Sequence, residues 1–270
     1  MTRHFLVIGA QRCGTTWLHH QLEGHPQIAM ARPTRPEPKV FLDDLAPDQD
    51  RAWYVRTWFG HASPGQVLGE KSTSYVDRPD AIERIRTVLG DVPLVVQLRD
   101  PVARAVSHWR FSTESGLEQR TLTEALAANL EGPLPWDPSR TSVSPYAYLE
   151  RGRYAESLRP WLDAFGDLLH VQVLEDLLAD PSRIAETFTH VGVDPSPAAD
   201  VSVQPVNRSH PGGPAETLDP SVEADVRQSF AESDRELAAL LGRSLPWSPA
   251  TTTTTTTTTT SMQQDEEPHR

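Results

Sequence analysis

Apolar positions along the chain form two kinds of pattern: short continuous runs, and longer stretches in which apolar residues recur every three or four positions. Four runs have the length and composition of buried β-strands: Phe5–Ile8, Val67–Gly69, Leu94–Leu98 and His170–Leu174. The periodic stretches predict helices near residues 14–24, 78–89, 101–113, 145–165, 181–191 and 220–241. Because strands and helices alternate, we expect an α/β fold of three layers, with helices on both faces of a mainly parallel central sheet.

Two regions fall outside this alternation. Residues 114–144 are rich in proline and contain one short helical pattern near 122–130, so we interpret them as a loop-rich insertion suited to a lid. Residues 250–270 begin with a run of threonines and have no apolar period, and we expect this tail to be disordered. The remaining chain, residues 1–249, has the size and apolar content of one domain.

The charge of the chain is negative overall and uneven. Lys and Arg number 25 against 37 Asp and Glu, which gives a formal net charge of −12. This balance argues against a nucleic acid or an anionic membrane as partner. Residues 1–120 carry 15 basic and 14 acidic side chains, so the excess negative charge lies in the later part. We therefore expect any anion site to be N-terminal.

The single cysteine, Cys13, excludes an internal disulfide and a cysteine-rich metal site. No apolar stretch has the length of a secretory signal or a membrane span. Both observations favour a cytoplasmic protein.

The first apolar strand runs directly into a glycine-bounded turn and then into a helical pattern, which is typical of a phosphate-binding loop. Gly9 and Gly14 have the spacing of the nucleotide-triphosphatase loop, but Thr15 stands where that loop has its lysine. The basic side chain within the turn is Arg12. The turn therefore predicts an anion site whose cation comes from inside the loop.

A second candidate anion site follows the strand at residues 94–98. Arg99 ends this strand, Asp100 and Pro101 begin a helix, and Ser107 lies about two turns into it. An arginine fork and a serine hydroxyl together suit a phosphate group. Taken alone, the segment is better explained by Arg99 pairing with Asp100 or with a neighbouring helix end, and by Ser107 facing solvent.

The only two lysines of the chain, Lys39 and Lys71, lie in segments that end predicted strands. Glu70 precedes Lys71, and a carboxylate beside an ammonium can divide proton abstraction and charge stabilisation between them. An adjacent Glu-Lys pair is more commonly a surface ion pair. The residues alone do not decide between the two interpretations.

In their order along the chain, these segments resemble the sulfotransferases that use 3′-phosphoadenosine 5′-phosphosulfate (PAPS), in particular the glycan-type branch and its bacterial relatives. The resemblance covers roughly the first 190 residues. It rests on Gly9–Leu18, Gly24–Pro26, Glu37–Asp43, Gly69–Ser72, Leu98–Ser107 and Gly152–Leu162. The resemblance implies a P-loop-type fold and transfer of a sulfuryl group to a hydroxyl.

The resemblance also implies roles on the nucleotide side. Residues 10–16 would hold the 5′-phosphosulfate, and the predicted cofactor-binding residues here are Gln11, Arg12, Cys13, Gly14, Thr15, Thr16 and Trp17. Arg12 takes the position of the family's catalytic lysine, and Arg99 and Ser107 would hold the 3′-phosphate. Arg208 would stand in for a late basic loop over the nucleotide. No metal is implied, because cationic side chains can balance the charge of the transferring group.

On the acceptor side, Glu70 matches the family's proposed base, and Lys39 and Lys71 match positions near the acceptor and the transferring group. His108 is a weaker candidate base, because its helical position gives no reason for its ring to reach an acceptor. Cys13 is best explained as a small residue that fits a tight loop.

Two other functions are compatible with these residues. One is a small-molecule kinase or nucleotide hydrolase with a degenerate phosphate loop, which would need ATP and Mg²⁺. The other is a non-catalytic nucleotide-binding protein. For a sulfotransferase we expect the acceptor to be a sugar hydroxyl or a hydroxylated secondary metabolite, ahead of a phenol or an amine. The net charge of −12 disfavours a polyanionic glycan, and the oligomeric state cannot be inferred from the sequence.

Overall fold

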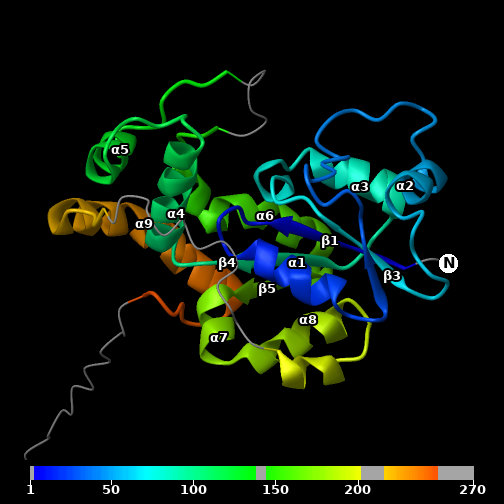
Figure 1. Cartoon of the computed structure of the whole chain (residues 1–270). Coiled ribbons are helices and arrows are strands. Elements are labelled where there is room, and N and C mark those ends of the chain that lie inside the picture. The colour runs from blue at the N-terminus through cyan, green and yellow to red at the C-terminus, as the bar shows by residue number, and fades with distance from the viewer. Residues whose placement is uncertain (1–2, 138–143, 202–215, 249–270) are drawn as a thin grey trace, which may run out of the picture.

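The computed structural model describes residues 3–137, 144–201 and 216–248. Its centre is a sheet formed by five strands: β1 (His4–Gly9), β2 (Ile28–Met30), β3 (Val67–Lys71), β4 (Leu94–Leu98) and β5 (Leu169–Val173). The strands lie in the order β2-β3-β1-β4-β5, and every neighbouring pair is parallel (Figure 1). The predicted α/β fold with a parallel sheet is confirmed.

Helices surround this sheet (Figure 1). Those of the described residues are α1 (Thr15–Glu23), α2 (Arg51–Trp58), α3 (Ala81–Leu89), α4 (Pro101–Glu114), α5 (Leu122–Asn129), α6 (Tyr154–Phe165), α7 (Leu174–Ala179), α8 (Ile184–His190) and α9 (Pro220–Leu241). None of them has both the length and the apolar character needed to span a bilayer.

Side chains alternate along each strand, so the sheet presents two apolar faces. One face, with Phe5, Val7 and Val95, packs against α1, α7 and α8. The other face, with Leu6 and Ile8, packs against α2, α3, α6 and α9. The result is the expected arrangement of three layers.

The insertion predicted at 114–144 is in part a packed element of the domain. Its helix α5 buries Leu122 and Leu126 against Trp109 of α4 and Phe230 of α9. Residues 138–143 lie outside the described residues, and a lid function for this region stays a prediction. The tail at 250–270 and Arg208 also lie outside the described residues.

Several elements differ from the expectation. The sequence pattern did not predict β2 or α7, because elements of three and six residues are too short to show a period. The aromatic residues Trp53, Tyr54, Trp58 and Phe59 have helical spacing, but the predicted helices did not include α2. Asp50 caps α2 by accepting the N–H of Trp53 at 2.8 Å. The helix expected from residue 145 begins only at Tyr154, after a short 3₁₀ helix, η2 (Glu150–Gly152).

The strand order reverses at β1. From there the chain proceeds through β2 and β3 on one side, and through β4 and β5 on the other. Open α/β sheets bind ligands beyond the carboxyl ends of their strands at such a point. The glycine turn after β1, the end of β3 and the start of α4 all lie at this edge.

Candidate active site

The phosphate loop joins β1 to α1 through a residue in left-handed backbone. Gly14 precedes α1 with a φ of 81°, a conformation that favours glycine. A Cβ at this position would lie 2.9 Å from the side-chain amide nitrogen of Gln97. Gly14 provides no side-chain cap for α1, which suits a helix N-terminus that receives an anion.

A chain of buried polar side chains holds the loop from the sheet side. Gln97 on β4 donates to the carbonyl of Cys13 at 2.5 Å and accepts from Gln172 on β5 at 2.8 Å. Gln172 in turn accepts from the hydroxyl of Thr187 on α8 at 2.6 Å. All three side chains are buried, so water does not compete for these hydrogen bonds.

Cys13 is fully buried beneath the loop. Burial raises the pKa of its thiol to about 11, and the Tyr154 hydroxyl lies 3.4 Å from its sulfur. Tyr154 also donates to the carbonyl of Arg99 at 2.8 Å. The Cys13 thiol therefore stays protonated at neutral pH and packs the loop against α6.

Gln11 joins the loop to the segments that follow β3 and precede α6. Its side-chain nitrogen donates to the hydroxyl of Ser74 at 3.0 Å, and its oxygen accepts from Arg151 at 2.5 Å. Arg151 also approaches Asp77 at 3.5 Å. Through these hydrogen bonds, Gln11 holds the loop in position.

Arg12 extends toward α4. Its guanidinium donates to the hydroxyl of Ser107 at 3.2 Å and lies 4.9 Å from the centre of the Phe111 ring. Burial lowers its pKa below the ordinary value, but a guanidinium remains charged in such a site. The structure therefore places Arg12 with the residues predicted to hold the 3′-phosphate.

On the nucleotide side, Arg99 and Ser107 both line a cavity of about 700 Å³ beside the start of α4. The hydrogen bond that Arg99 makes within the described residues goes to the carbonyl of Arg12 at 3.4 Å. Asp100 does not pair with Arg99, because it binds both guanidinium nitrogens of Arg227 on α9 at 2.9 and 3.0 Å. The simple ion-pair explanation of Arg99 is therefore wrong.

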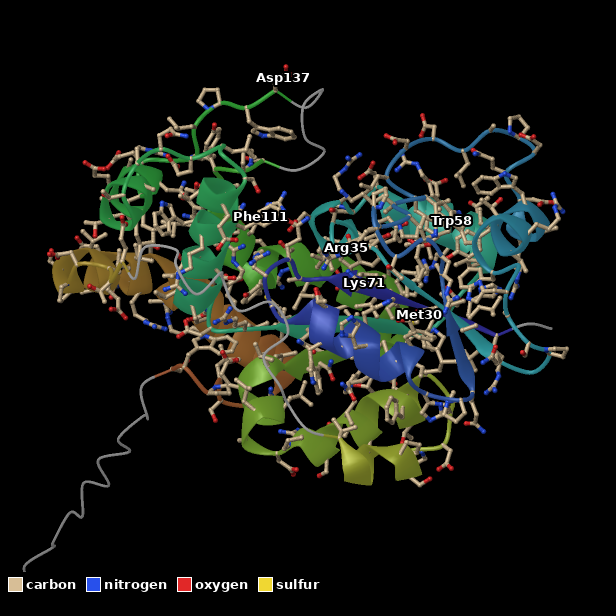
Figure 2. All side chains as sticks on the ribbon, in the orientation of Figure 1. Met30, Arg35, Trp58, Lys71, Phe111 and Asp137 are labelled. Atoms are coloured by element: carbon tan, nitrogen blue, oxygen red, sulfur yellow. The ribbon has the colours of Figure 1, made fainter. Side chains whose placement is uncertain are left out.

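On the acceptor side, Lys71 forms an ion pair with Glu37, which lies in the connection between β2 and α2. Glu37 also accepts from the backbone N–H and the hydroxyl of Thr73, both at 3.0 Å. The side chains of Lys71 and Glu37 are 12% and 17% exposed, so the pair is shielded but still in contact with solvent. In Figure 2, Lys71 and Phe111 mark the two sides of this edge of the sheet.

Glu70 faces away from Lys71, because adjacent residues of a strand point to opposite faces of the sheet. Its carboxylate is completely buried and accepts hydroxyl hydrogen bonds from Tyr54 at 2.5 Å and from Ser72 and Tyr75 at 2.6 Å. Burial raises its pKa above the ordinary value. This geometry does not agree with the prediction that Glu70 works beside Lys71 on an acceptor, since no acceptor can touch a carboxylate so enclosed.

Glu70 instead supports the connection between β2 and α2. Ser72, which donates to Glu70, accepts the backbone N–H of Lys39 at 2.8 Å. Tyr75, which also donates to Glu70, accepts the backbone N–H of Phe41 at 3.1 Å. Lys39 has a φ of 53°, which is uncommon for a residue with a side chain, and the hydrogen bond to Ser72 holds it there.

His108 belongs to the packing of α4. Its buried ring meets the ring of Tyr148 edge-on, with 5.0 Å between centroids, and burial lowers its pKa well below the ordinary value. This agrees with the prediction that His108 is a weaker candidate base than Glu70. The predicted nucleotide role of Arg208 lies outside the described residues.

The structure thus brings Arg12, Arg99 and Ser107 together and places Lys71 on the other side of the loop. It makes Glu37, not Glu70, the carboxylate beside Lys71. Sequence reasoning included Glu37 in a family segment but gave it no role. The segment has no regular pattern, and only the fold brings it to a partner 34 positions away.

A parallel sheet with a phosphate loop at its switch point, and cations on both sides of that loop, defines a phosphate-loop α/β protein. No group of three or more metal-binding side chains occurs within the described ranges. The expectation that no metal takes part stays a prediction.

Comparisons with known proteins narrow the class of phosphate-loop proteins to one family. No family model matches the chain. Mouse (Mus musculus) heparan sulfate glucosamine 3-O-sulfotransferase 3B1 is 31% identical over 179 residues, which cover 66% of this chain and 42% of that protein. Human (Homo sapiens) heparan sulfate glucosamine 3-O-sulfotransferase 5 is 25% identical over 265 residues, which cover 90% and 73%.

A solved sulfotransferase structure from Alicyclobacillus acidocaldarius has the same fold, with a TM-score of 0.71 at 23% identity over 91% of this chain and 98% of that one. Together these similarities show that the chain belongs to the sulfotransferase family. The chain spans less than half of the length of the mouse relative and of several others.

Proposed function

We propose that the protein transfers a sulfuryl group from PAPS to a hydroxyl of a sugar or of a small-molecule secondary metabolite. The observation that carries this proposal is the distribution of charge around the phosphate loop. Arg99 and Ser107 line a cavity on one side, and the Lys71–Glu37 pair lies on the other. A donor with a 3′-phosphate and a transferable group on its 5′ side requires two such regions.

The nucleotide would be held by the loop and by the cavity beside α4. The N-terminal N–H groups of α1 suit the 5′-phosphosulfate, while Arg99 and Ser107 suit the 3′-phosphate. Arg12 lies between these two groups through its contact with Ser107. Its proposed role is electrostatic, because a guanidinium stabilises developing negative charge but is a poor proton donor.

The proposed base is Glu37 in place of Glu70. Glu37 would accept the proton of the acceptor hydroxyl as its oxygen bonds to sulfur and the bond from sulfur to the bridging phosphate oxygen breaks. The leaving nucleotide is 3′-phosphoadenosine 5′-phosphate (PAP). Lys71 orients Glu37 and places a positive charge beside the transferring group, and Thr73 holds the other carboxylate oxygen. Lys39, on the same connection, remains a candidate for contact with the acceptor.

The acceptor class follows from the relatives and from charge. The names of the curated relatives state that they act on a glucosamine of heparan sulfate, which favours a sugar hydroxyl. The net charge of −12 disfavours a highly sulfated chain. A neutral sugar or a hydroxylated metabolite is therefore the proposed acceptor, in the cytoplasm.

Calorimetric titration with PAP, ADP and ATP, in the absence of added metal, tests the nucleotide. We expect tight binding of PAP and weak binding of the other two, because only PAP carries the 3′-phosphate. A preference for ATP that appears with Mg²⁺ would overturn the proposal in favour of a kinase or hydrolase. PAP binding without turnover of PAPS across an acceptor panel would favour a non-catalytic nucleotide-binding protein.

A further inference from the structure

The cavity beside α4 contains a cation to which the family resemblance assigns no role. Arg110 lines the same cavity as Arg99 and Ser107. It lies three residues after Ser107 on α4, and residues at this spacing lie on one helix face with Cβ atoms about 5–6 Å apart. Ser107 and Arg110 therefore present a hydroxyl and a guanidinium side by side.

Arg110 makes no ion pair within the described residues, in contrast to several other arginines. Arg78, Arg84 and Arg120 all form ion pairs with carboxylates. For Arg110, no ion pair or hydrogen bond occurs within residues 3–137, 144–201 and 216–248. Its side chain is half-buried, so this cation is also not fully surrounded by water.

Two carboxylates that line the cavity already have partners. Asp100 is bound to Arg227, and Glu216 accepts the backbone N–H of Leu122 at 2.7 Å. Glu223 also lines the cavity but makes no ion pair with Arg110. Arg99 and Arg110 are thus cations that line the cavity and form no ion pair with a carboxylate of the described residues.

We propose that Arg110 is a further ligand of the 3′-phosphate and, with Arg99, determines the preference for a 3′-phosphorylated nucleotide. This inference rests on the proposed function. A phosphate monoester carries close to two negative charges at neutral pH. Two arginines match this charge better than Arg99 alone, and Ser107 supplies a hydroxyl in the same cavity.

The test compares four proteins by calorimetric titration with PAP and with ADP: wild type, Arg110→Gln, Arg110→Lys and the control Arg56→Gln. Arg56 is an exposed arginine of α2, far along the chain from the cavity segments. Arg110→Gln should weaken PAP binding about 10- to 100-fold, because it removes a charged hydrogen-bond donor. ADP binding should change less than about twofold, since ADP lacks the group that Arg110 contacts.

Arg110→Lys should lie between wild type and Arg110→Gln, because it keeps the charge but loses the fork. Arg56→Gln should match wild type with both nucleotides. Thermal melts of each variant establish that it is folded.

The proposal is overturned if Arg110→Gln retains the wild-type ratio of PAP to ADP affinity, whether both affinities are unchanged or both fall equally. Failure of the proposed function has a different signature, since wild type itself would then bind PAP no better than ADP. In that case there is no 3′-phosphate preference for Arg110 to determine.

Discussion

The two sides of the phosphate loop differ in how far their charges are already neutralised. On the acceptor side, Lys71 is paired with Glu37, and Thr73 donates a hydrogen bond to the second carboxylate oxygen of Glu37. On the nucleotide side, Arg99 and Arg110 face a cavity without a described carboxylate partner. On the acceptor side, the charged groups hold one another in position. On the nucleotide side, the positive charge is available for a ligand.

This difference matches what each side would bind. An acceptor hydroxyl brings no charge, so the groups that act on it must be positioned by the protein itself. A 3′-phosphate brings its own charge, and cations without an internal partner need not give up an ion pair to bind it. Glu70 supports the acceptor side indirectly. It accepts from the hydroxyls of Ser72 and Tyr75, and these hydroxyls accept the backbone N–H groups of Lys39 and Phe41.

Glu37→Gln should have the largest effect, on the acceptor side alone. The amide cannot take a proton, so turnover should fall about 10²- to 10⁴-fold. PAP affinity and thermal stability should change little, because the nucleotide residues are untouched. Steady-state turnover with PAPS and calorimetry with PAP measure the two quantities.

The control for Glu37→Gln is Glu83→Gln, the same change at an exposed position on α3. If Glu37→Gln keeps near-normal turnover while folded Glu70→Gln has none, the base is Glu70 and Glu37 has no role in proton transfer.

Arg99→Ala should act on the nucleotide side alone. Loss of its guanidinium should weaken PAP binding about 100-fold, while ADP binding changes less than about threefold. Calorimetric titration with both nucleotides measures the difference. Equal weakening of PAP and ADP would place Arg99 on the 5′ side and contradict its assigned role.

Glu70→Gln should lower the stability of the fold by about 3 kcal/mol, because the amide replaces one of the two acceptor oxygens with a nitrogen that cannot accept, so a buried hydroxyl loses its partner. The pKa of Glu70 is raised above its ordinary 4.5, so the stability it contributes is greatest below that value and declines as pH rises through the raised pKa. The cost of the substitution should thus be larger at about pH 5 than at about pH 8.

Urea denaturation of wild type and Glu70→Gln at the two pH values measures this cost. An unchanged free energy of unfolding would mean that Glu70 does not support the connection between β2 and α2.

Arg12→Lys should have a smaller effect, because Arg12 acts through charge. The lysine keeps that charge but loses the contact between guanidinium and Phe111, so turnover should fall less than about tenfold, whereas Arg12→Met should cost about 100-fold. Turnover of the two variants measures the contrast. Equal losses would show that the shape of the guanidinium is needed as well as its charge.

Cys13 should give the smallest effect. Its thiol has a pKa of about 11 and no exposure, so reaction with a thiol reagent should be slow at neutral pH. Bound PAP should slow it further by holding the loop closed. Rapid labelling of the folded protein would contradict the buried position.

Much of this fold was predictable from local pattern. The strands β1, β3, β4 and β5 coincide with short, mostly apolar runs, and the helices α3, α4 and α9 carry an apolar period long enough to identify them. The glycine turn likewise indicates a phosphate loop, because Gly14 has a conformation that few other residues adopt. The elements that were missed, β2 and α7, have too few residues to show a period.

The candidate site was only half predictable. Arg12, Arg99 and Ser107 lie in patterned segments directly after strands, where a parallel sheet brings chain segments to one edge. On the acceptor side, the prediction that Glu70 works beside Lys71 does not match its enclosed position, and strand alternation alone indicates that Glu70 and Lys71 point to opposite faces.

The sequence by itself determined the class of fold, the phosphate loop and the N-terminal location of the anion site, since each depends on neighbours within a few residues. Only the tertiary structure decided which carboxylate meets Lys71, which one is buried, and which arginines keep their charge free. The ion pairs depend on contacts between segments 34 to 127 positions apart, such as Lys71 with Glu37 and Arg227 with Asp100. No local pattern encodes the burial and pairing that such contacts produce.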